Sequence, residues 1–263
     1  MKNLLIFINP EKRFVNKNLK GETGILAKIQ IDNSLDLGWK RENILLVTNF
    51  DYEYNGVKAL VVDDSNYCAF SVTASKINVI LTLFEQGIIK KDLYWFHDLD
   101  AFQLEKITED ELELGDMDMG ITEYGKTTIK PLHDKRLSTG SIFFKQSAQD
   151  IFEWIKIKVY QYKCNEEVGL LELTKIPKYK LSERMKRLDI TYNLATRKRQ
   201  VSVNYQAAKK PLKVIHFHPF DKRSVRSEGK NDNIAVCIYG KNKINKVLVT
   251  KRLVKIFNYH GIC

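Results

Sequence analysis

Two carboxylates stand one residue apart at Asp98 and Asp100, directly after an apolar run at residues 93–96. The run predicts a buried strand, and the turn that must follow it lets both side chains face one cation. Carboxylate oxygens suit hard divalent ions such as Mg²⁺ and Mn²⁺, with phosphate or water as further ligands. We therefore predict a divalent metal site here. The alternative is a turn or helix cap that bears solvated carboxylates.

A second pair of the same spacing, Asp116 and Asp118, shows how readily this pattern arises in a chain with 29% charged residues. It follows an acidic, loop-like stretch at residues 108–111 instead of an apolar run. We therefore do not expect a metal site at this second pair.

A histidine lies at the end of a later strand-like segment, residues 213–217. Imidazole binds borderline ions such as Mn²⁺, so His216 can complete the site of Asp98 and Asp100. Taken alone, a strand histidine is more often a structural residue. Lys222, a few residues later, carries a cation that can neutralise a diphosphate and stabilise a departing phosphate group.

The first hundred residues alternate between strand-like and helix-like patterns, which favours an α/β unit with a largely parallel sheet. Ligands bind such sheets at the carboxyl ends of the strands. Asn9, Asn49 and Asp51 occupy such ends, as the first Asp pair does. The expected strands cover residues 4–8, 43–48, 57–62, 93–96, 119–123, 141–145, 213–217 and 234–239, and the expected helices cover 25–37, 75–86, 150–162 and 244–257; residues 180–210 show no clear period.

In chain order these features resemble glycosyltransferase family 8, whose members have the GT-A fold. That family has a nucleotide-binding first strand, a Ser/Arg helix start, an Asp-x-Asp motif, a small-residue strand, an Asp-Gln-Asp helix start and a late histidine motif. The resemblance covers about residues 4–223. The matching segments are Ile8–Pro10, Ser75–Lys76, Asp98–Asp100, Ser138–Ser141, Asn165–Glu167 and His216–Lys222.

The resemblance implies an α/β, Rossmann-like GT-A fold with a central, mostly parallel mixed sheet flanked by helices. The glycosyltransferase domain would span residues 1–223, and a basic C-terminal extension, residues 224–263, would pack on it. The implied activity is transfer of a hexose or pentose from a nucleotide-sugar, with UDP-sugars favoured, to an acceptor hydroxyl.

The resemblance also assigns roles to individual residues. Asp98, Asp100 and His216 would hold Mn²⁺ or Mg²⁺, which would bridge the two phosphates of the donor. Lys222 would contact the diphosphate. The donor would be bordered by further residues, namely Asn9, Asn49 and Asp51 at the nucleoside, Lys76 and Asp98 near the phosphates, and Thr139 and Gly140 in the sugar pocket.

Several residues depart from the family pattern. Lys76 replaces an arginine, and residues 138–140 (Ser-Thr-Gly) lack the side-chain amide of Asn-Ser-Gly. Residues 165–167 (Asn-Glu-Glu) replace Asp-Gln-Asp, and no Pro-Trp follows Lys222. Neither the sugar nor the stereochemical outcome can therefore be inherited from the family.

The stereochemical outcome of the transfer, inversion or retention, decides whether a base from the protein is needed. An inverting enzyme requires a carboxylate to take the acceptor proton, and the candidates are Glu167, Glu166 and Glu123 in that order; Asp100 is counted with them at the reaction centre. In a retaining enzyme the leaving phosphate can assist instead. The alternative for Glu166 and Glu167 is that they only open a helix and interact with its dipole.

Charge is distributed unevenly along the 263 residues. The net charge is +11, yet residues 180–263 hold 20 Lys and Arg against 5 Asp and Glu, while residues 1–179 are net acidic. This predicts an acidic acceptor, with nucleic acid favoured. A hydroxymethylated pyrimidine in DNA, as modified by some bacteriophage enzymes, would fit after flipping from the stack. The basic residues expected to contact this acceptor are Lys186, Arg187, Arg197, Lys198, Arg199, Lys209 and Lys210.

Two alternatives remain. The acceptor can be a glycan or lipopolysaccharide, where a basic surface faces anionic sugars or a membrane. A protein of another class, a metal-dependent nuclease or nucleic-acid-binding protein, could use Asp98, Asp100 and His218.

The location is predicted from three features of the sequence. The apolar run at the start ends too early for a signal peptide, and no segment is long enough to insert in a membrane. The four dispersed cysteines predict reduced thiols, so we expect a cytoplasmic protein, in the host cytoplasm if the protein is viral.

Overall fold

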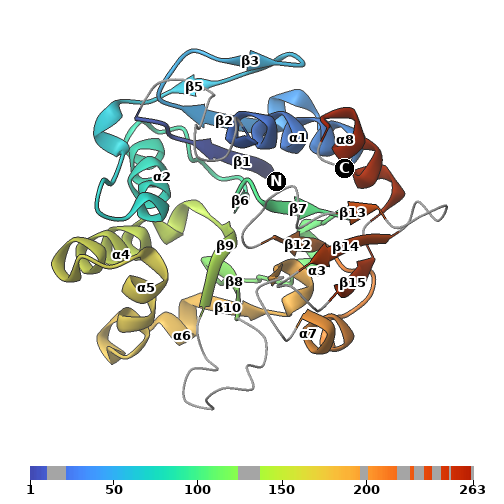
Figure 1. The fold of residues 1–263 in the computed structure, drawn as a ribbon. Helices are drawn as coiled ribbons and strands as arrows, with labels where there is room; N and C mark the ends of the chain where they lie inside the picture. Colours follow the sequence, from blue (N-terminus) through green and yellow to red (C-terminus); the bar gives the residue numbers. More distant parts are fainter. Residues whose placement is uncertain are drawn as a thin grey trace.

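The computed structural model describes residues 1–10, 22–123, 137–195, 201–217, 226–227, 234–238, 244–248 and 250–261. Its centre is a seven-stranded sheet in the order β10-β8-β9-β6-β1-β2-β5 (Figure 1). Every neighbouring pair is parallel except the two that β9 makes, with β6 and β8. The strands are Lys2–Phe7 (β1), Ile44–Thr48 (β2), Leu60–Val61 (β5), Tyr94–His97 (β6), Met119–Glu123 (β8), Leu137–Phe144 (β9) and Met185–Leu188 (β10).

Helices cover both faces of this sheet (Figure 1). One face packs against α2 (Ser75–Glu85), α4 (Gln149–Tyr162) and α5 (Glu166–Thr174), and the other against α1 (Glu22–Asp36). Leu4 and Leu5 are adjacent on β1, and both are fully buried, the first toward α2 and the second toward α1. A strand covered on both faces must be apolar at consecutive positions, which explains the continuous run at residues 4–8.

A second, three-stranded sheet supplies the late histidine. Its order is β11-β12-β7, with bounds Leu194–Ala195 (β11), Val214–His216 (β12) and Ala101–Gln103 (β7). Phe102 and Phe217 from this sheet pack with Phe257 of α8 (Lys251–Tyr259) and with Leu26 of α1. The C-terminal helix is therefore part of a shared hydrophobic core.

The expected α/β architecture with a central, mostly parallel mixed sheet flanked by helices is confirmed. Two local expectations are wrong. The strand expected at 57–62 is divided between a hairpin, β3 (Glu53–Tyr54) with β4 (Val57–Lys58), and the separate strand β5. Asn55 and Gly56 have positive φ angles of 49° and 73°, as an Asn-Gly hairpin turn requires.

The helix expected at 244–257 is also wrong in its first half. Residues Ile244–Leu248 form β15, which pairs antiparallel with β14 (Ile234–Ile238), and β14 also pairs with β13 (Arg226–Ser227). The helix begins only after Thr250, whose side chain accepts a hydrogen bond from the backbone N–H of Leu253. Thr250 is thus an N-cap. The sequence did not reveal it, because apolar and basic residues lie on both sides of Thr250.

Residues 180–210, which show no period, contain α6 (Leu181–Arg184), β10, β11 and α7 (Val201–Ala207). Short elements of two to seven residues are too brief to produce a recognisable repeat. Among the described residues, the remaining α-helix is α3 (Glu109–Leu112). Within the described residues, no helix is both long enough and apolar enough to cross a bilayer.

Candidate functional site

The Asp98–Asp100 turn joins the two sheets. It leaves the carboxyl end of β6 and enters β7 at Ala101, with the Ala101 N–H donating to the Asp98 carbonyl at 2.9 Å. His97 supports the turn, because its Nδ1 lies 2.8 Å from the Ala101 carbonyl oxygen. Burial lowers the pKa of His97 to about 4, so this ring is neutral and structural at physiological pH.

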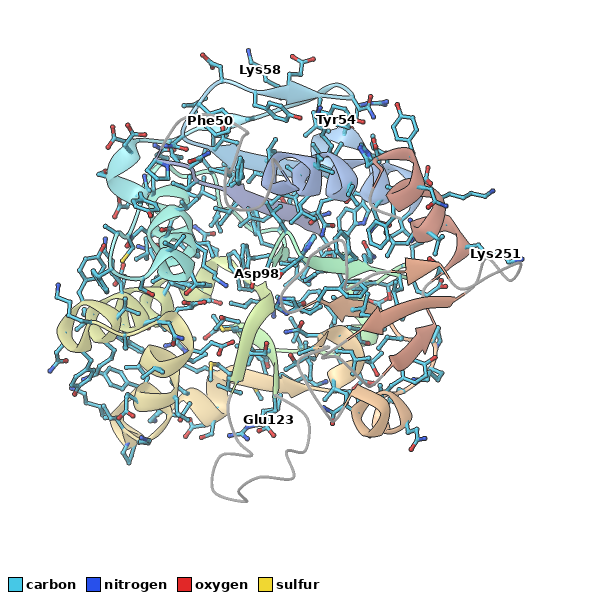
Figure 2. The ribbon with its side chains drawn as sticks, in the orientation of Figure 1. Phe50, Tyr54, Lys58, Asp98, Glu123 and Lys251 are labelled. Atoms are coloured by element: carbon cyan, nitrogen blue, oxygen red, sulfur yellow. The ribbon has the colours of Figure 1, made fainter. Side chains whose placement is uncertain are left out.

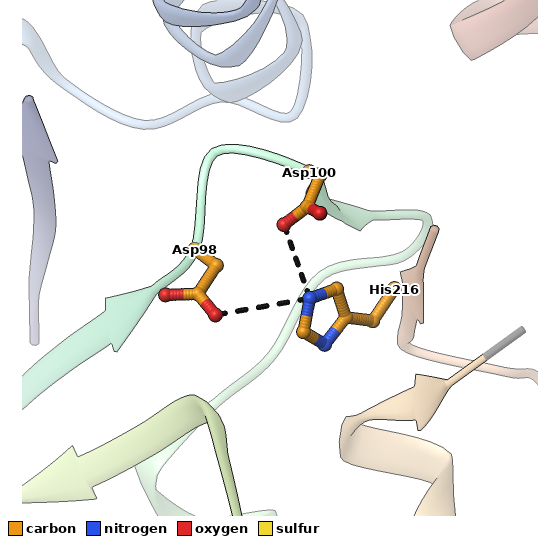
Figure 3. Close-up of side chains that lie close together, drawn as sticks. All are labelled: Asp98, Asp100 and His216. Carbon is orange, nitrogen blue, oxygen red and sulfur yellow. Dashed lines mark hydrogen bonds and ion pairs between the residues drawn. The ribbon is translucent and has the colours of Figure 1, made fainter. Parts of the chain in front are cut away.

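His216 reaches the same turn from β12, which pairs with β7 so that His216 lies opposite Ala101. Its Nε2 is 3.0 Å from Asp100 Oδ1 and 3.8 Å from Asp98 Oδ2 (Figure 3). One ligand atom from each of the three residues lies within 4.8 Å of the others. Residues 116 positions apart in the sequence thus form one cluster.

Gly140 on β9 is required by this cluster. A Cβ atom there would lie 2.2 Å from His216 Cε1, so any side chain would displace the imidazole. The resemblance places Gly140 in a sugar pocket, whereas in this structure its lack of a side chain makes room for the histidine.

The cluster suits the implied divalent ion. Carboxylate oxygens suit Mg²⁺ and Mn²⁺, and imidazole is a frequent ligand of transition-metal ions. The histidine is buried, while the carboxylates are about one quarter exposed. Exposed ligand oxygens leave part of the coordination shell for water or phosphate. Burial alone would lower the pKa of His216, but Asp100 and Asp98 raise it above its usual value, as expected at a site built for a cation.

Lys76 on α2 occupies the other side of Asp98. Its buried Nζ lies 2.8 Å from Asp98 Oδ1 and 3.0 Å from Glu166 Oε1. Burial alone would lower the pKa of Lys76, but these two carboxylates raise it above its usual value, so the lysine is charged. The Asp98 carboxylate therefore lies between the Lys76 ammonium and the His216 ring.

Glu166 and Glu167 begin α5, which Asn165 caps by accepting from the Val168 N–H. Glu166 is buried and accepts hydrogen bonds from Thr139 Oγ1 at 2.9 Å and Thr73 Oγ1 at 2.8 Å, in addition to its contact with Lys76. Burial raises the pKa of Glu166, but Lys76, a backbone N–H and the Thr73 hydroxyl lower it by more, so its net pKa lies below the usual value. A buried carboxylate with a low pKa and several partners is a poor proton acceptor.

Glu167 differs from its neighbour, because it is partly exposed and its Oε1 lies 3.3 Å from the Thr139 N–H. Glu123, the third candidate base, ends β8 and forms a close ion pair with Arg187. In the view of Figure 2 Glu123 lies at the edge of the molecule, away from Asp98. Of the three candidate bases, Glu167 has the arrangement that best suits the role.

The strand-end residues near β1 and β2 are held together by one amide. Asn49 Oδ1 accepts from the Asn9 N–H, and Asn49 Nδ2 donates to the Asn9 carbonyl and to Asp64 Oδ1, each at 2.8 Å. Asn49 is buried and shapes the loop that leaves β1, whereas Asp51 is exposed. Asn9 is partly exposed beside this loop.

Four of the predicted acceptor residues lie in the described part of the chain, and they have different local surroundings. Lys186 Nζ lies 3.2 Å from Glu113 Oε2, and Arg187 pairs with Glu123. Lys209 and Lys210 are exposed, with Lys210 Nζ 3.4 Å from the centroid of the Tyr205 ring. Lys222, His218, Arg197, Lys198 and Arg199 lie outside the described residues.

Three residues at the site were not predicted. Thr73 donates a hydrogen bond to Glu166, and Asp64 accepts one from Asn49. Asn193 bonds both Ser138 Oγ and His216 Nδ1. Asn193 thus brings an amide to Ser138 from a segment 55 positions away in the sequence. Asn193 lies in the stretch without a period, so only its polarity beside apolar neighbours could have drawn attention to it.

Solved structures share this architecture, although no protein-family model and no curated protein matches the sequence. The galactosyltransferase LgtC, in complex with donor and acceptor sugar analogs, matches with a TM-score of 0.53 at 10% identity, over 85% of this chain and 89% of that one. A glycosyltransferase involved in glycosylation of the major capsid of PBCV-1 matches with a TM-score of 0.52 at 11% identity, over 82% of this chain and 93% of that one. The chain therefore has the GT-A fold of glycosyltransferases.

Proposed function

We propose that the protein is a metal-dependent glycosyltransferase, which moves a sugar from a nucleotide-sugar, favoured to be a UDP-sugar, to an acceptor hydroxyl. The observation that carries this proposal is the meeting of Asp98, Asp100 and His216 within 4.8 Å at the end of β6 of a GT-A fold. Structural neighbours described as glycosyltransferases support it.

The residues around the cluster have separate tasks in this proposal. A divalent ion held by Asp98, Asp100 and His216 would supply positive charge for a diphosphate leaving group. Lys76 fixes Asp98 by holding its Oδ1, which leaves Oδ2 directed toward His216. Glu167 takes the acceptor proton if the reaction inverts. Asn9, Asp51, Thr139 and Lys222 remain the residues proposed to border or contact the donor.

For the acceptor we propose a 5-hydroxymethylpyrimidine in DNA. The support is the strong positive charge of residues 180–263, which suits a polymer of closely spaced phosphates better than a neutral sugar. A cytoplasmic location belongs to this proposal, because nucleotide-sugars and DNA meet there.

A glycan acceptor is the second candidate, and a specific observation favours it. Lys186 and Arg187 already pair with Glu113 and Glu123, so part of the basic charge is neutralised within the protein. The neighbour LgtC was solved with an acceptor sugar analog.

The direct test is a transfer assay with product masses. The protein is incubated with Mn²⁺, a set of nucleotide-sugars and either hydroxymethylated duplex DNA or oligosaccharides. The DNA is then digested to nucleosides. A hexose or pentose mass on hydroxymethylpyrimidine supports the full proposal, and a mass gain on oligosaccharides alone moves the acceptor to glycans.

The same assay tests the enzyme class. DNA cut in the presence of Mg²⁺ without any nucleotide-sugar would favour a nuclease. Sugar transfer to neither acceptor and no hydrolysis of any nucleotide-sugar would contradict the glycosyltransferase proposal.

A further inference from the structure

Asn193 is a buried amide that touches the candidate metal cluster without belonging to it. It follows a short 3₁₀ turn, Ile190–Tyr192, and precedes β11, whose Ala195 lies opposite His216 in parallel register. From its position before β11, the Asn193 side chain reaches the imidazole of His216. Only 3% of the residue is exposed, so its polar atoms need partners within the protein.

Both ends of the amide have partners. Asn193 Nδ2 donates to Ser138 Oγ at 2.8 Å, and Asn193 Oδ1 lies 3.2 Å from His216 Nδ1. An amide oxygen can only accept a hydrogen bond, so in this arrangement the imidazole carries a hydrogen on Nδ1. The other ring nitrogen, Nε2, faces Asp98 and Asp100.

Two further contacts hold the ring in this orientation. Gly140 lies so close that a Cβ atom there would meet His216 Cε1 at 2.2 Å, so the ring has no room on that side. The backbone of β12 is fixed between β7 and β11. Nε2 thus lies 3.0 Å from Asp100 Oδ1, a position from which it can donate a hydrogen to the carboxylate or ligate a cation together with it.

We infer that Asn193 is a positioning residue, which holds His216 with its hydrogen on Nδ1 so that Nε2 can ligate a divalent cation. The inference rests on the metal site of the proposed function. Partners of this kind are general at metal-binding histidines, because the hydrogen bond to the second nitrogen fixes both tautomer and ring orientation.

Three variants separate this role from ordinary packing. Asn193→Leu keeps the approximate shape but removes the acceptor, whereas Asn193→Asp keeps an oxygen that accepts from Nδ1. Asn66→Ala is the matched control, because Asn66 is also buried but its amide bonds the Asp63 carbonyl and the Thr82 hydroxyl instead of His216. Mn²⁺ affinity is measured by calorimetry, and thermal unfolding checks that each variant is folded.

We expect Asn193→Leu to bind Mn²⁺ about 10- to 100-fold more weakly than the wild type. Asn193→Asp should bind within about threefold of the wild type or more tightly, because a carboxylate accepts the same N–H. Asn66→Ala should change unfolding but not Mn²⁺ affinity. Long-range ¹H–¹⁵N spectra of the wild type with Mg²⁺ should show the hydrogen of His216 on Nδ1.

The outcomes distinguish this inference from the proposed function. If the wild type binds Mn²⁺ and Asn193→Leu binds it equally well, or if the spectra place the hydrogen on Nε2, the role of Asn193 is overturned and the metal site stands. Equal losses in Asn193→Leu and Asn193→Asp would overturn it as well. If the wild type binds no divalent ion, the metal site and this inference fall together.

Discussion

The site at the end of β6 and the basic segment, residues 180–210, were both expected to bind substrate, but they are organised differently. At the site, buried strands bring Asp98, Asp100 and His216 within 4.8 Å of one another. In the basic segment, Lys186 and Arg187 pair with Glu113 and Glu123, while Lys209 and Lys210 are exposed. Strand ends converge because a sheet fixes their positions, whereas a count of charges says nothing of where each charge points.

The largest expected effect concerns the proton acceptor. Glu167→Gln removes the carboxylate that is partly exposed at the site, and we expect kcat to fall by about 10²- to 10⁴-fold if the enzyme inverts. The KM for the donor should change little, since the residue keeps its size. Steady-state kinetics measure both, and Glu123→Gln is the control, because Glu123 pairs with Arg187 instead. Full activity of the Glu167→Gln enzyme would show that Glu167 is not the base.

The next effect concerns the buried charges of the site. Lys76→Met leaves the Asp98 and Glu166 carboxylates without their cation, and the free energy of unfolding should fall by about 3–5 kcal/mol. Lys175→Met is the matched control, since Lys175 pairs with Glu172 on the surface and should lose less than about 1 kcal/mol. Urea unfolding measures both, and equal losses would show that the site is no better organised than the surface.

A smaller effect is expected at Gly140. Gly140→Ala forces His216 to move, because the new Cβ would lie 2.2 Å from the ring, and we expect a loss of about 1–3 kcal/mol together with weaker Mn²⁺ binding. At Gly120 a Cβ would meet Leu114 at 2.9 Å, so Gly120→Ala should destabilise the sheet without affecting the metal. Unfolding and Mn²⁺ titration of both variants test this, and unchanged Mn²⁺ affinity in Gly140→Ala would count against His216 as a ligand.

The smallest effect is expected in the basic segment. Lys186 and Arg187 already have carboxylate partners, so replacing both by alanine should change the free energy of unfolding by less than about 1 kcal/mol. Binding to duplex DNA should keep its salt dependence for the same reason. A decrease of about two in the slope of log affinity against log salt would instead show that both residues contact phosphates.

Much of the fold could be predicted, because its buried strands are continuous apolar runs and its longer helices have apolar residues at helical spacing. Consecutive apolar residues at 4–8 and 93–96 indicated strands covered on both faces, and the strand ends then located Asp98 and Asp100. The hairpin at Asn55–Gly56 was missed although its turn signal is strong. The N-cap at Thr250 was missed because β15 and α8 are both rich in apolar and basic residues.

The supporting contacts of the site were harder to predict. Asn193 and Thr73 act through side-chain hydrogen bonds to residues 23 and 93 positions away, and no local pattern encodes such pairs. For the same reason, the sequence could not show that Glu166, a candidate base, is a poor proton acceptor. Its position at a helix start was clear from the sequence, but only the structure places it against Lys76.

The central claim is that Asp98, Asp100 and His216 hold a divalent ion that binds the diphosphate of a nucleotide. The most direct measurement is calorimetric binding of UDP with and without Mn²⁺, to the wild type and to Asp100→Ala, with Asp116→Ala as a control from the second Asp-x-Asp pair. We predict that Mn²⁺ strengthens UDP binding to the wild type and to Asp116→Ala, and that Asp100→Ala loses this enhancement. Equal UDP binding with and without Mn²⁺, or an undiminished enhancement in a folded Asp100→Ala protein, would contradict the claim.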